Sequence, residues 1–351
     1  LQAVRKTMQN DTTILAFLDR AARSEIFDEE EIAEALQALM SDEATDAQRA
    51  AFLMALRVRG ETPPEITGAA QLLRDRMVPV DIPPGAVDIV GTGGDGHGTY
   101  NVSTCAAIVA AGAGVTVAKH GNRSVSSKSG ASDVLQALGV KVDRSASEVA
   151  DTIAKAGIGF MWAPMHHPAM KVWAPARAAL KTRTLFNLLG PIANPARVTR
   201  QIVGVFAPHW VEPIADALTN LGADHVWVVH GADGLDELST TGPTTVAELR
   251  EGSVAVFEVT PEQAGLPRAS LADLQGGDSQ TNAKAILDVL DGKKGPFRDI
   301  VLLNAGAALI VGERVASITE GVERAARAID TGRAKATLEK LIAATNQPSS
   351  A

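Results

Sequence analysis

The sequence predicts a mixed α/β protein in which a mostly parallel central sheet is flanked by helices, with a smaller all-helical domain beside it. Two observations support this fold class. Short apolar runs alternate with helix-like segments between Val87 and His230, an order typical of parallel βαβ units. Residues 1–80, by contrast, contain a series of amphipathic helical patterns. We therefore expect two domains of different architecture.

Residues 1–80 form the predicted helical domain, with a helical insertion at about 170–195. One run begins at Glu29 and keeps apolar residues at helical spacing, and a second covers 47–59. Thr62-Pro63-Pro64-Glu65 starts a third helix, because proline suits a first turn and a glutamate three residues after a threonine completes a capping box. These helices have broad apolar faces, which indicates a packed bundle.

Residues 81–169 and 196–351 form the predicted α/β domain. Its centre is a βαβ unit with a strand at 87–90, a glycine-rich loop, a helix that starts near Ser103 and a second strand at 115–118. Both strands end at one crevice, the place where open α/β sheets bind ligands. The later expected elements are strands at 140–142, 157–162, 201–206, 225–230, 244–249, 253–259 and 299–303, and helices at 145–156, 211–221, 282–291, 304–312 and 319–331.

The composition excludes several classes of function. A net charge of −8 and a pI near 5.4 argue against broad nucleic-acid binding. The single cysteine, Cys105, excludes an intrachain disulfide and is interpreted as a buried packing residue. No signal peptide and no apolar run of membrane-spanning length is visible, so we expect a cytoplasmic protein with no membrane partner. Only the tail, 348–351, is expected to be disordered.

The loop at residues 91–98 is suited to a phosphorylated sugar. Its glycines let consecutive backbone N–H groups approach an anion. Ser103 and Thr104 then open a helix whose N-terminus adds positive dipole. Asp95 can accept hydrogen bonds from ribose hydroxyls, and Lys119 supplies a compact cation for pyrophosphate.

Two common nucleotide motifs fit this loop less well. Gly91, Gly93 and Gly96 match the dinucleotide-binding spacing, but the following helix starts too late. The second strand ends in Lys119, where the ribose diol of a dinucleotide needs a carboxylate. A Walker A loop is excluded because no Lys-Ser or Lys-Thr pair follows the glycines.

Four ordered motifs resemble those of the anthranilate phosphoribosyltransferase family. The motifs are Gly91-Thr92-Gly93-Gly94-Asp95, Asn101-Val102-Ser103-Thr104, Lys119-His120-Gly121-Asn122-Arg123 and Lys128-Ser129-Gly130-Ala131-Ser132-Asp133. Further matches are Ala163-Pro164, His166-His167-Pro168, Ala176-Arg177 and the segment 183–191. The resemblance implies transfer of the 5-phosphoribosyl group of 5-phosphoribosyl 1-pyrophosphate (PRPP) to the amine of anthranilate. The products would be N-(5-phosphoribosyl)anthranilate and pyrophosphate, in tryptophan biosynthesis.

The resemblance also implies where the two substrates bind. An arginine on a helix is more often just exposed, but Arg177 can hold the anthranilate carboxylate in a bidentate contact. No residue is assigned to acid or base catalysis, and His120 is given an orienting role. The implied PRPP-binding residues are Gly91, Thr92, Gly93, Gly94, Asp95, Thr99, Asn101, Val102, Ser103, Thr104, Lys119 and Ser127. The implied anthranilate-binding residues are Gly91, Asn122, Pro164, His167, Arg177 and Pro191.

An adjacent pair of carboxylates, Asp236 and Glu237, follows the strand at 225–230. Such a pair in a loop is usually just solvated. A pyrophosphate group nearby changes this interpretation, because Mg²⁺ is typically held by one or two carboxylates together with substrate phosphates. The resemblance implies Mg²⁺ as the cofactor, with Ser103, Asp236 and Glu237 as its ligands.

The implied chemistry needs no nucleophilic triad, and the sequence shows none. The aromatic amine is neutral near neutral pH, so positioning and stabilisation of the leaving pyrophosphate are sufficient. A pyrimidine nucleoside phosphorylase of the same fold is an alternative, although segments 119–123 and 183–191 favour the transferase. A nucleic-acid-binding relative is a second alternative, which the negative net charge disfavours. The resemblance further implies a homodimer formed through the helical domain.

Overall fold

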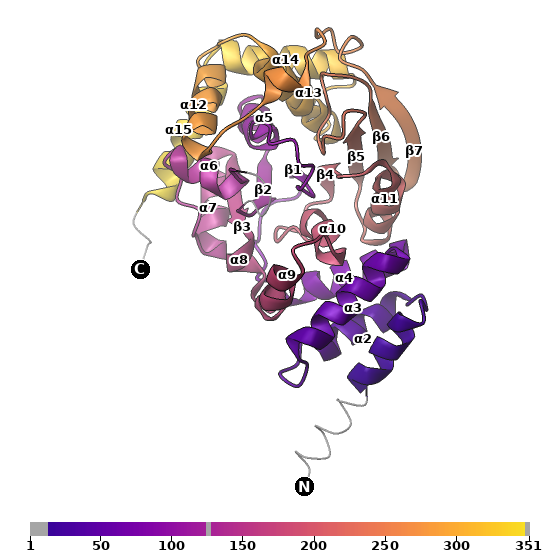
Figure 1. Cartoon of the computed structure of the whole chain (residues 1–351). Helices are drawn as coiled ribbons and strands as arrows, with labels where there is room; N and C mark the ends of the chain where they lie inside the picture. Colours follow the sequence, from indigo (N-terminus) through magenta and orange to yellow (C-terminus); the bar gives the residue numbers. More distant parts are fainter. Residues whose placement is uncertain (1–12, 124–127, 348–351) are drawn as a thin grey trace.

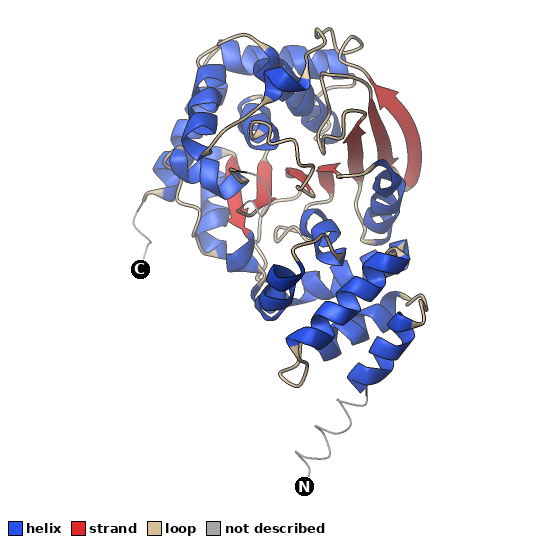
Figure 2. Ribbon diagram, in the orientation of Figure 1, coloured by secondary structure: helices blue, strands red, loops and turns tan. Residues whose placement is uncertain are grey.

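A computed structural model describes residues 13–123 and 128–347, and it has the predicted mixed α/β architecture (Figure 1, Figure 2). A seven-stranded sheet crosses the larger body in the order β3-β2-β1-β4-β5-β6-β7. Strands β1 to β5 are parallel, and β6 and β7 extend the sheet in antiparallel fashion. The strands are β1 (Val87–Gly91), β2 (Val117–Gly121), β3 (Ile158–Trp162), β4 (Arg200–Gly204), β5 (His225–Gly231), β6 (Thr244–Arg250) and β7 (Ser253–Val259).

The strand order reverses next to β1. The chain builds β2 and β3 on one side of β1 and then returns to build β4 and β5 on the other. Strands β1 and β4 pair residue for residue along their whole length, so Gly91 lies opposite Gly204 at the carboxyl ends of the two strands. A reversal of this kind opens a crevice beyond the carboxyl ends of the two strands. The glycine-rich loop that follows β1 is therefore placed at a ligand-binding position.

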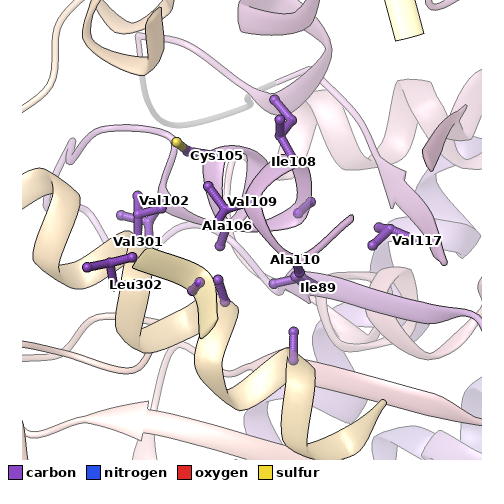
Figure 3. Packing of buried hydrophobic residues seen from close by; sticks show 14 of the residues in the cluster. Ile89, Val102, Cys105, Ala106, Ile108, Val109, Ala110, Val117, Val301 and Leu302 are labelled. Atoms are coloured by element: carbon purple, nitrogen blue, oxygen red, sulfur yellow. The ribbon is translucent and has the colours of Figure 1, made fainter. Parts of the chain in front are cut away.

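Helix α5 (Val102–Gly112) lies on the sheet and packs against α13 (Pro296–Val311). Figure 3 shows Val102, Ala106 and Val109 of α5 on the side that faces Val301 and Leu302 of α13, and Cys105 on another side of the same helix. Cys105 is completely buried, as predicted for a packing residue, and burial raises the pKa of its thiol. The other helices of this body are α6 (Ala131–Ala137), α7 (Ala146–Ala156), α11 (Val211–Asn220), α12 (Ser279–Leu290), α14 (Ile318–Asp330) and α15 (Arg333–Thr345), with short 3₁₀ turns η2 (Pro208–Trp210) and η3 (Leu271–Leu274).

The two faces of the sheet belong to two hydrophobic cores. Along β4, Ile202 faces the core that contains α5 and α13, and Val203 faces the core that contains the helical bundle. Along β5, Trp227 and Val226 divide in the same way. Alternation with period two is the expected pattern for a strand with helices on both faces. One core is thus shared between the sheet and the bundle.

The smaller body is a helical bundle, at the lower end of the view in Figure 1. Residues 13–22 are helical, and the segment at 163–192 adds short helices that pack against α3 and α4. The Glu65 carboxylate accepts hydrogen bonds from the Thr62 backbone N–H and hydroxyl, both at 3.0 Å, so the predicted capping glutamate is in place. The named helices are α2 (Glu29–Leu39), α3 (Asp46–Arg59), α4 (Pro63–Arg76), α8 (Ala163–His166), α9 (Ala174–Leu180) and α10 (Leu185–Ile192), and η1 (Pro168–Trp173) is a 3₁₀ helix.

Two expected strands are wrong. Residues 140–142 form no strand. The Val140 N–H donates to the Leu135 carbonyl and the Lys141 N–H donates to the Thr345 hydroxyl, so these N–H groups bond to helical residues and not to a neighbouring strand. Residues 299–303 lie inside α13, whose residues from Ile300 to Val311 are all buried. A helix surrounded on all sides by protein is apolar all round, and a short apolar run within it cannot be told from a buried strand by periodicity.

Of the helices in the two described ranges, none is both long enough and apolar enough to cross a membrane. The tail at 348–351, which was expected to be disordered, lies outside the described residues. Helix α15, which the sequence analysis did not anticipate, packs against α5 and α7. It closes the outer layer of the α/β body on the side away from the bundle (Figure 1).

Candidate active site

In the loop after β1, hydrogen bonds hold the first residue, Thr92, and glycines follow it. The Thr92 N–H donates to Gly204 O at 2.9 Å, and the Thr92 hydroxyl accepts from the Phe206 N–H at 3.0 Å. Gly93 and Gly94 follow with φ angles of 65° and 76°, in the left-handed region that glycine adopts without strain. The loop is therefore attached to the end of β4, and its glycines keep the backbone accessible.

The predicted carboxylate pair faces this loop. Asp236 accepts a hydrogen bond from the Gly93 N–H at 2.6 Å, and Glu237 accepts one from the Ser103 N–H at 3.2 Å. Both groups lie in the loop between β5 and β6. Burial raises the pKa of Asp236 to about 7 and that of Glu237 to about 8. Repulsion from Asp95 adds to the shift of Asp236, and repulsion between the pair adds to that of Glu237.

Glycines at the ends of two strands make room for this carboxylate loop. A Cβ atom on Gly91 would lie 2.4 Å from the Asp236 carboxylate, and one on Gly204 would lie 1.6 Å from the Asp236 carbonyl oxygen. Any larger residue at either position would push Asp236 away from the glycine loop. The sequence analysis identified Gly91 but did not identify Gly204.

Lys119 is the middle residue of β2 and is buried, with the charges of the two carboxylates close to it. Its ammonium group donates to the Ile89 carbonyl. Burial lowers the pKa of Lys119, while the charges of Asp88, Glu237 and Asp236 oppose that shift. The lysine therefore places a cationic group close to the carboxylate pair.

The donor set fits a hard divalent cation. Among the described residues, no group of three or more His, Cys, Asp and Glu side chains is arranged to hold a metal alone. Mg²⁺, however, usually takes one or two carboxylates and completes its shell with water and substrate phosphates. A buried carboxylate, Asp236, and a half-buried one, Glu237, whose pKa values are raised by desolvation and by repulsion, suit such an ion. Asp236, Glu237 and the hydroxyl of Ser103 are the residues that would hold it.

Two neutral histidines, both predicted site residues, lie close together near the start of the Gly190-Pro191 step. The rings of His120 and His167 are 5.1 Å apart, and His120 Nδ1 lies 3.1 Å from Gly190 O, next to Pro191. Burial lowers the pKa of His167 to about 4 and lowers that of His120 well below its usual range. Within the described ranges, the Nε2 atoms of both rings lack a hydrogen-bond partner. The corner formed by His120, His167 and Pro191 therefore offers uncharged polar groups within an apolar setting.

Arg177 on α9 is half-buried, and its guanidinium group lies over an aromatic ring. The guanidinium carbon lies 5.5 Å from the centre of the Phe186 ring, and burial lowers the pKa of the arginine. Asn122 and Pro164 are exposed, and within the described part of the chain no hydrogen bond joins either of them to Arg177. Ser127 lies outside the described residues.

The rest of the predicted PRPP segment is fixed by a distant part of the chain. Thr99 pairs with Gln275 in an isolated bridge, and the Asn282 amide donates to Asn101 Oδ1 at 2.9 Å. Val102 and Thr104 are buried in the first turn of α5, which leaves mainly their backbone for a ligand. Sequence reasoning missed the contribution of the last third of the chain, because no local pattern reports contacts over such distances.

Arg183 makes a second contact within the candidate site, and sequence reasoning gave this residue no role there. It precedes α10, and its guanidinium donates to the carbonyl of Gly94 in the glycine loop. The same group lies over the Phe206 ring, with 4.2 Å between the guanidinium carbon and the ring centre. The position belongs to the segment 183–191 that carried the resemblance, which was the signal available.

Comparison with known proteins relates both bodies to one group of enzymes. Residues 15–77 match the helical bundle domain of a glycosyl transferase family, and residues 83–335 match the α/β domain of that family. The anthranilate phosphoribosyltransferase of Parvibaculum lavamentivorans is 59% identical over 97% of this chain and 98% of its own length. The enzyme of that name from Rhodopseudomonas palustris (strain BisB18) is 60% identical over 90% of this chain and 94% of its own.

Solved structures agree with these matches. The anthranilate phosphoribosyltransferase of Thermus thermophilus has a TM-score of 0.89 at 43% identity and covers 94% of this chain and 99% of its own. The Saccharomyces cerevisiae enzyme, in complex with PRPP and Mg, has a TM-score of 0.88 at 30% identity and covers 95% and 98%. The fold and the crevice thus define a glycosyl transferase with a helical bundle and an α/β domain. Within that class, the chain belongs to the anthranilate phosphoribosyltransferase family.

Proposed function

We propose that this chain transfers the 5-phosphoribosyl group of PRPP to the amine of anthranilate and releases pyrophosphate, in tryptophan biosynthesis. One observation carries the proposal: at the switch point of the sheet, the glycine loop and the start of α5 face the carboxylate pair Asp236 and Glu237. The relatives named above match nearly the whole chain and carry this activity in their names.

The PRPP half of the site consists of backbone N–H groups and a few charged side chains. We assign the pyrophosphate to the loop at 91–95, to the first turn of α5 and to Lys119. Fixed N–H groups in a sheltered crevice stabilise charge on a leaving group without reorganising. When bound, Mg²⁺ supplies further neutralisation of the pyrophosphate charge. Asp95 accepts hydrogen bonds from the ribose hydroxyls in this assignment.

The acceptor half binds a flat benzoate with a neighbouring amine. We assign the carboxylate of anthranilate to Arg177, and the ring and the amine to the corner formed by His120, His167 and Pro191. Neutral histidines suit this position, because a charged imidazole would compete with Arg177 for the carboxylate. The Saccharomyces cerevisiae relative has been solved in complex with 4-fluoroanthranilate, which supports an aromatic acceptor. Asn122 and Pro164 complete the path of the acceptor in this proposal.

The test is a fluorescence assay with purified protein, PRPP, MgCl₂ and anthranilate. We expect anthranilate fluorescence to disappear with time and to persist when MgCl₂ is replaced by a chelator. The double variant Asp236→Asn, Glu237→Gln should reduce turnover by a factor of about 100 or more, since it removes both charged oxygen ligands. Persistent fluorescence with the wild-type protein, together with phosphate-dependent cleavage of thymidine, would assign the chain to nucleoside phosphorolysis instead.

The assembly and the location of the protein are part of the same proposal. Leu15, Ile26 and Val58 of the helical body expose large apolar side chains, with 54%, 62% and 81% of them accessible to solvent. Contact between two chains removes such apolar surface from water, which favours association. We assign these side chains to a homodimer formed through the helical domain, in the cytoplasm. Light scattering of the purified protein would then give twice the mass of one chain, and a monomeric mass would contradict the assignment.

A further inference from the structure

Asn304 is a polar residue in the middle of an apolar helix. Helix α13 is buried at every position from Ile300 to Val311, and Asn304 is 0% exposed. The helix is enclosed by α5, α14 and the sheet. A buried amide destabilises the folded state unless its hydrogen bonds are satisfied. Its presence at the centre of the core therefore needs a structural reason.

The side-chain amide of Asn304 forms hydrogen bonds with the loop that carries Asp236 and Glu237. Its Oδ1 accepts from the Leu238 N–H at 3.0 Å, and its Nδ2 donates to Leu238 O at 2.8 Å. The second hydrogen of the amide goes to Ile300 O at 2.9 Å within the helix. The side chain thus pairs with both backbone groups of Leu238, much as a neighbouring strand would.

Leu238 is the residue directly after Glu237, so this pairing fixes the backbone beside the metal-binding pair. The hydrogen bonds of Asp236 and Glu237 themselves go to the glycine loop and to the start of α5, which are parts of the substrate site. Elsewhere in the same loop, Asp233 bonds to the hydroxyls of Ser239 and Thr241, which closes the loop on itself. The two bonds from Asn304 tie the loop to the rigid helical layer.

We propose that Asn304 is a positioning residue for the metal-binding carboxylates Asp236 and Glu237. It holds the backbone after Glu237 at a fixed distance from α13, so that both carboxylates meet the cation without rearrangement. The proposal rests on the proposed function, since it assumes that these carboxylates bind Mg²⁺ together with PRPP. Outer partners that orient metal ligands typically contribute a factor of about 10 to 100 in metal affinity or activity.

The principal variant is Asn304→Leu. Leucine has the same number and branching of side-chain heavy atoms as asparagine, although its methyl groups make it larger, and it leaves both backbone groups of Leu238 unpaired. We expect the MgCl₂ concentration for half-maximal turnover to rise about tenfold, and the KM for anthranilate at saturating MgCl₂ to change less than about twofold. Calorimetric titration of PRPP at a fixed, subsaturating MgCl₂ concentration should show a Kd about tenfold higher, without any turnover in the cell.

Leu309→Ala is the matched control. Leu309 is also fully buried in α13, so its truncation destabilises the helix without removing a hydrogen bond to the loop. This control should melt at a lower temperature and keep the wild-type response to MgCl₂. If Asn304→Leu does not fold, Asn304→Ala replaces it, because a small side chain admits water to Leu238 and should raise the MgCl₂ requirement by a smaller factor, about threefold.

Two failures can be told apart. A wild-type protein that neither binds PRPP nor consumes anthranilate would refute the proposed function. An active wild-type protein whose Asn304 variant melts early but keeps the wild-type MgCl₂ response and PRPP affinity would refute the positioning role alone. Asn304 would in that case be a structural residue like Leu309.

Discussion

At the scale of single residues, Arg177 places a positive charge in a partly desolvated setting. Within the described residues it has an aromatic neighbour, Phe186, and no anion paired with it. Such a cation gains most from a ligand carboxylate, and a charge-assisted hydrogen bond contributes about 1.5–3 kcal/mol. We therefore expect Arg177→Ala to raise the KM for anthranilate about tenfold or more and to leave the KM for PRPP within about twofold.

Arg177→Lys is the conservative comparison, because lysine keeps the charge but cannot make a planar bidentate contact. It should give an intermediate KM for anthranilate in the same steady-state assay. An equal rise in both KM values after Arg177→Ala would mean that the arginine supports the fold of the site, and the assignment to the carboxylate would be withdrawn.

His167 makes stability depend on pH in a defined direction. Burial, with the nearby His166, lowers its pKa from the usual 6.5 to about 4, so the folded protein holds it neutral. Between these two values the unfolded chain binds the extra proton, and stability falls as the pH decreases. The contribution is complete above about pH 6.5, and about 2 kcal/mol of it is lost by pH 5. His120 and His166 shift in the same direction.

The check is the free energy of urea unfolding at about pH 7.5 and about pH 5. Wild-type protein should lose about 2 kcal/mol more over this interval than His167→Gln, which cannot take up the proton. The exposed His209 provides the control, and His209→Gln should behave like the wild type. Equal losses in all three proteins would show that His167 is free to ionise in the folded state.

At the scale of elements, Arg183 joins the start of α10 to the phosphate-binding half of the site. Its bond to the Gly94 carbonyl and its contact with the Phe206 ring hold the glycine loop from the side of the acceptor. Arg183→Ala should therefore raise the KM for PRPP about tenfold, the usual effect of losing one hydrogen bond from a charged group. Lys171→Ala removes an exposed cation from the same helical segment and should leave both KM values unchanged.

The sequence predicted the elements wherever a regular pattern met a clear boundary. The strands around Gly91 and Lys119 are bounded by glycines and polar residues, and the site positions there follow from the motifs. The buried run at 299–303 has neither a period nor a polar face, and it belongs to a helix. The contact between Asn304 and Leu238 spans 66 residues, so no local spacing could indicate it. Sequence reasoning missed the roles of Asn282 and Gly204 for the same reason, because their contacts are also with residues far away in the sequence.

At the scale of the whole molecule, the proposed substrate site lies between two bodies that share a core. The helical bundle and one face of the sheet form a single hydrophobic cluster, which includes Leu56, Trp173 and Val228. Arg74 reinforces the contact from α4, because its guanidinium donates to Ile192 O at 2.9 Å and to Leu221 O at 3.0 Å. The residues on the bundle side that we assign to the acceptor are thereby held at a fixed place relative to the glycine loop.

A shared core predicts that the two bodies unfold together. Trp173 lies in the core next to the bundle, and Trp227 lies on the opposite face of the sheet. Two variants, each retaining one of these tryptophans with the other three replaced by phenylalanine, report on the two regions separately. Their fluorescence should change at the same urea concentration as the far-UV circular dichroism, which is the test for a cooperative transition. A lower midpoint for Trp173 alone would mean that the bundle separates from the sheet before the sheet unfolds.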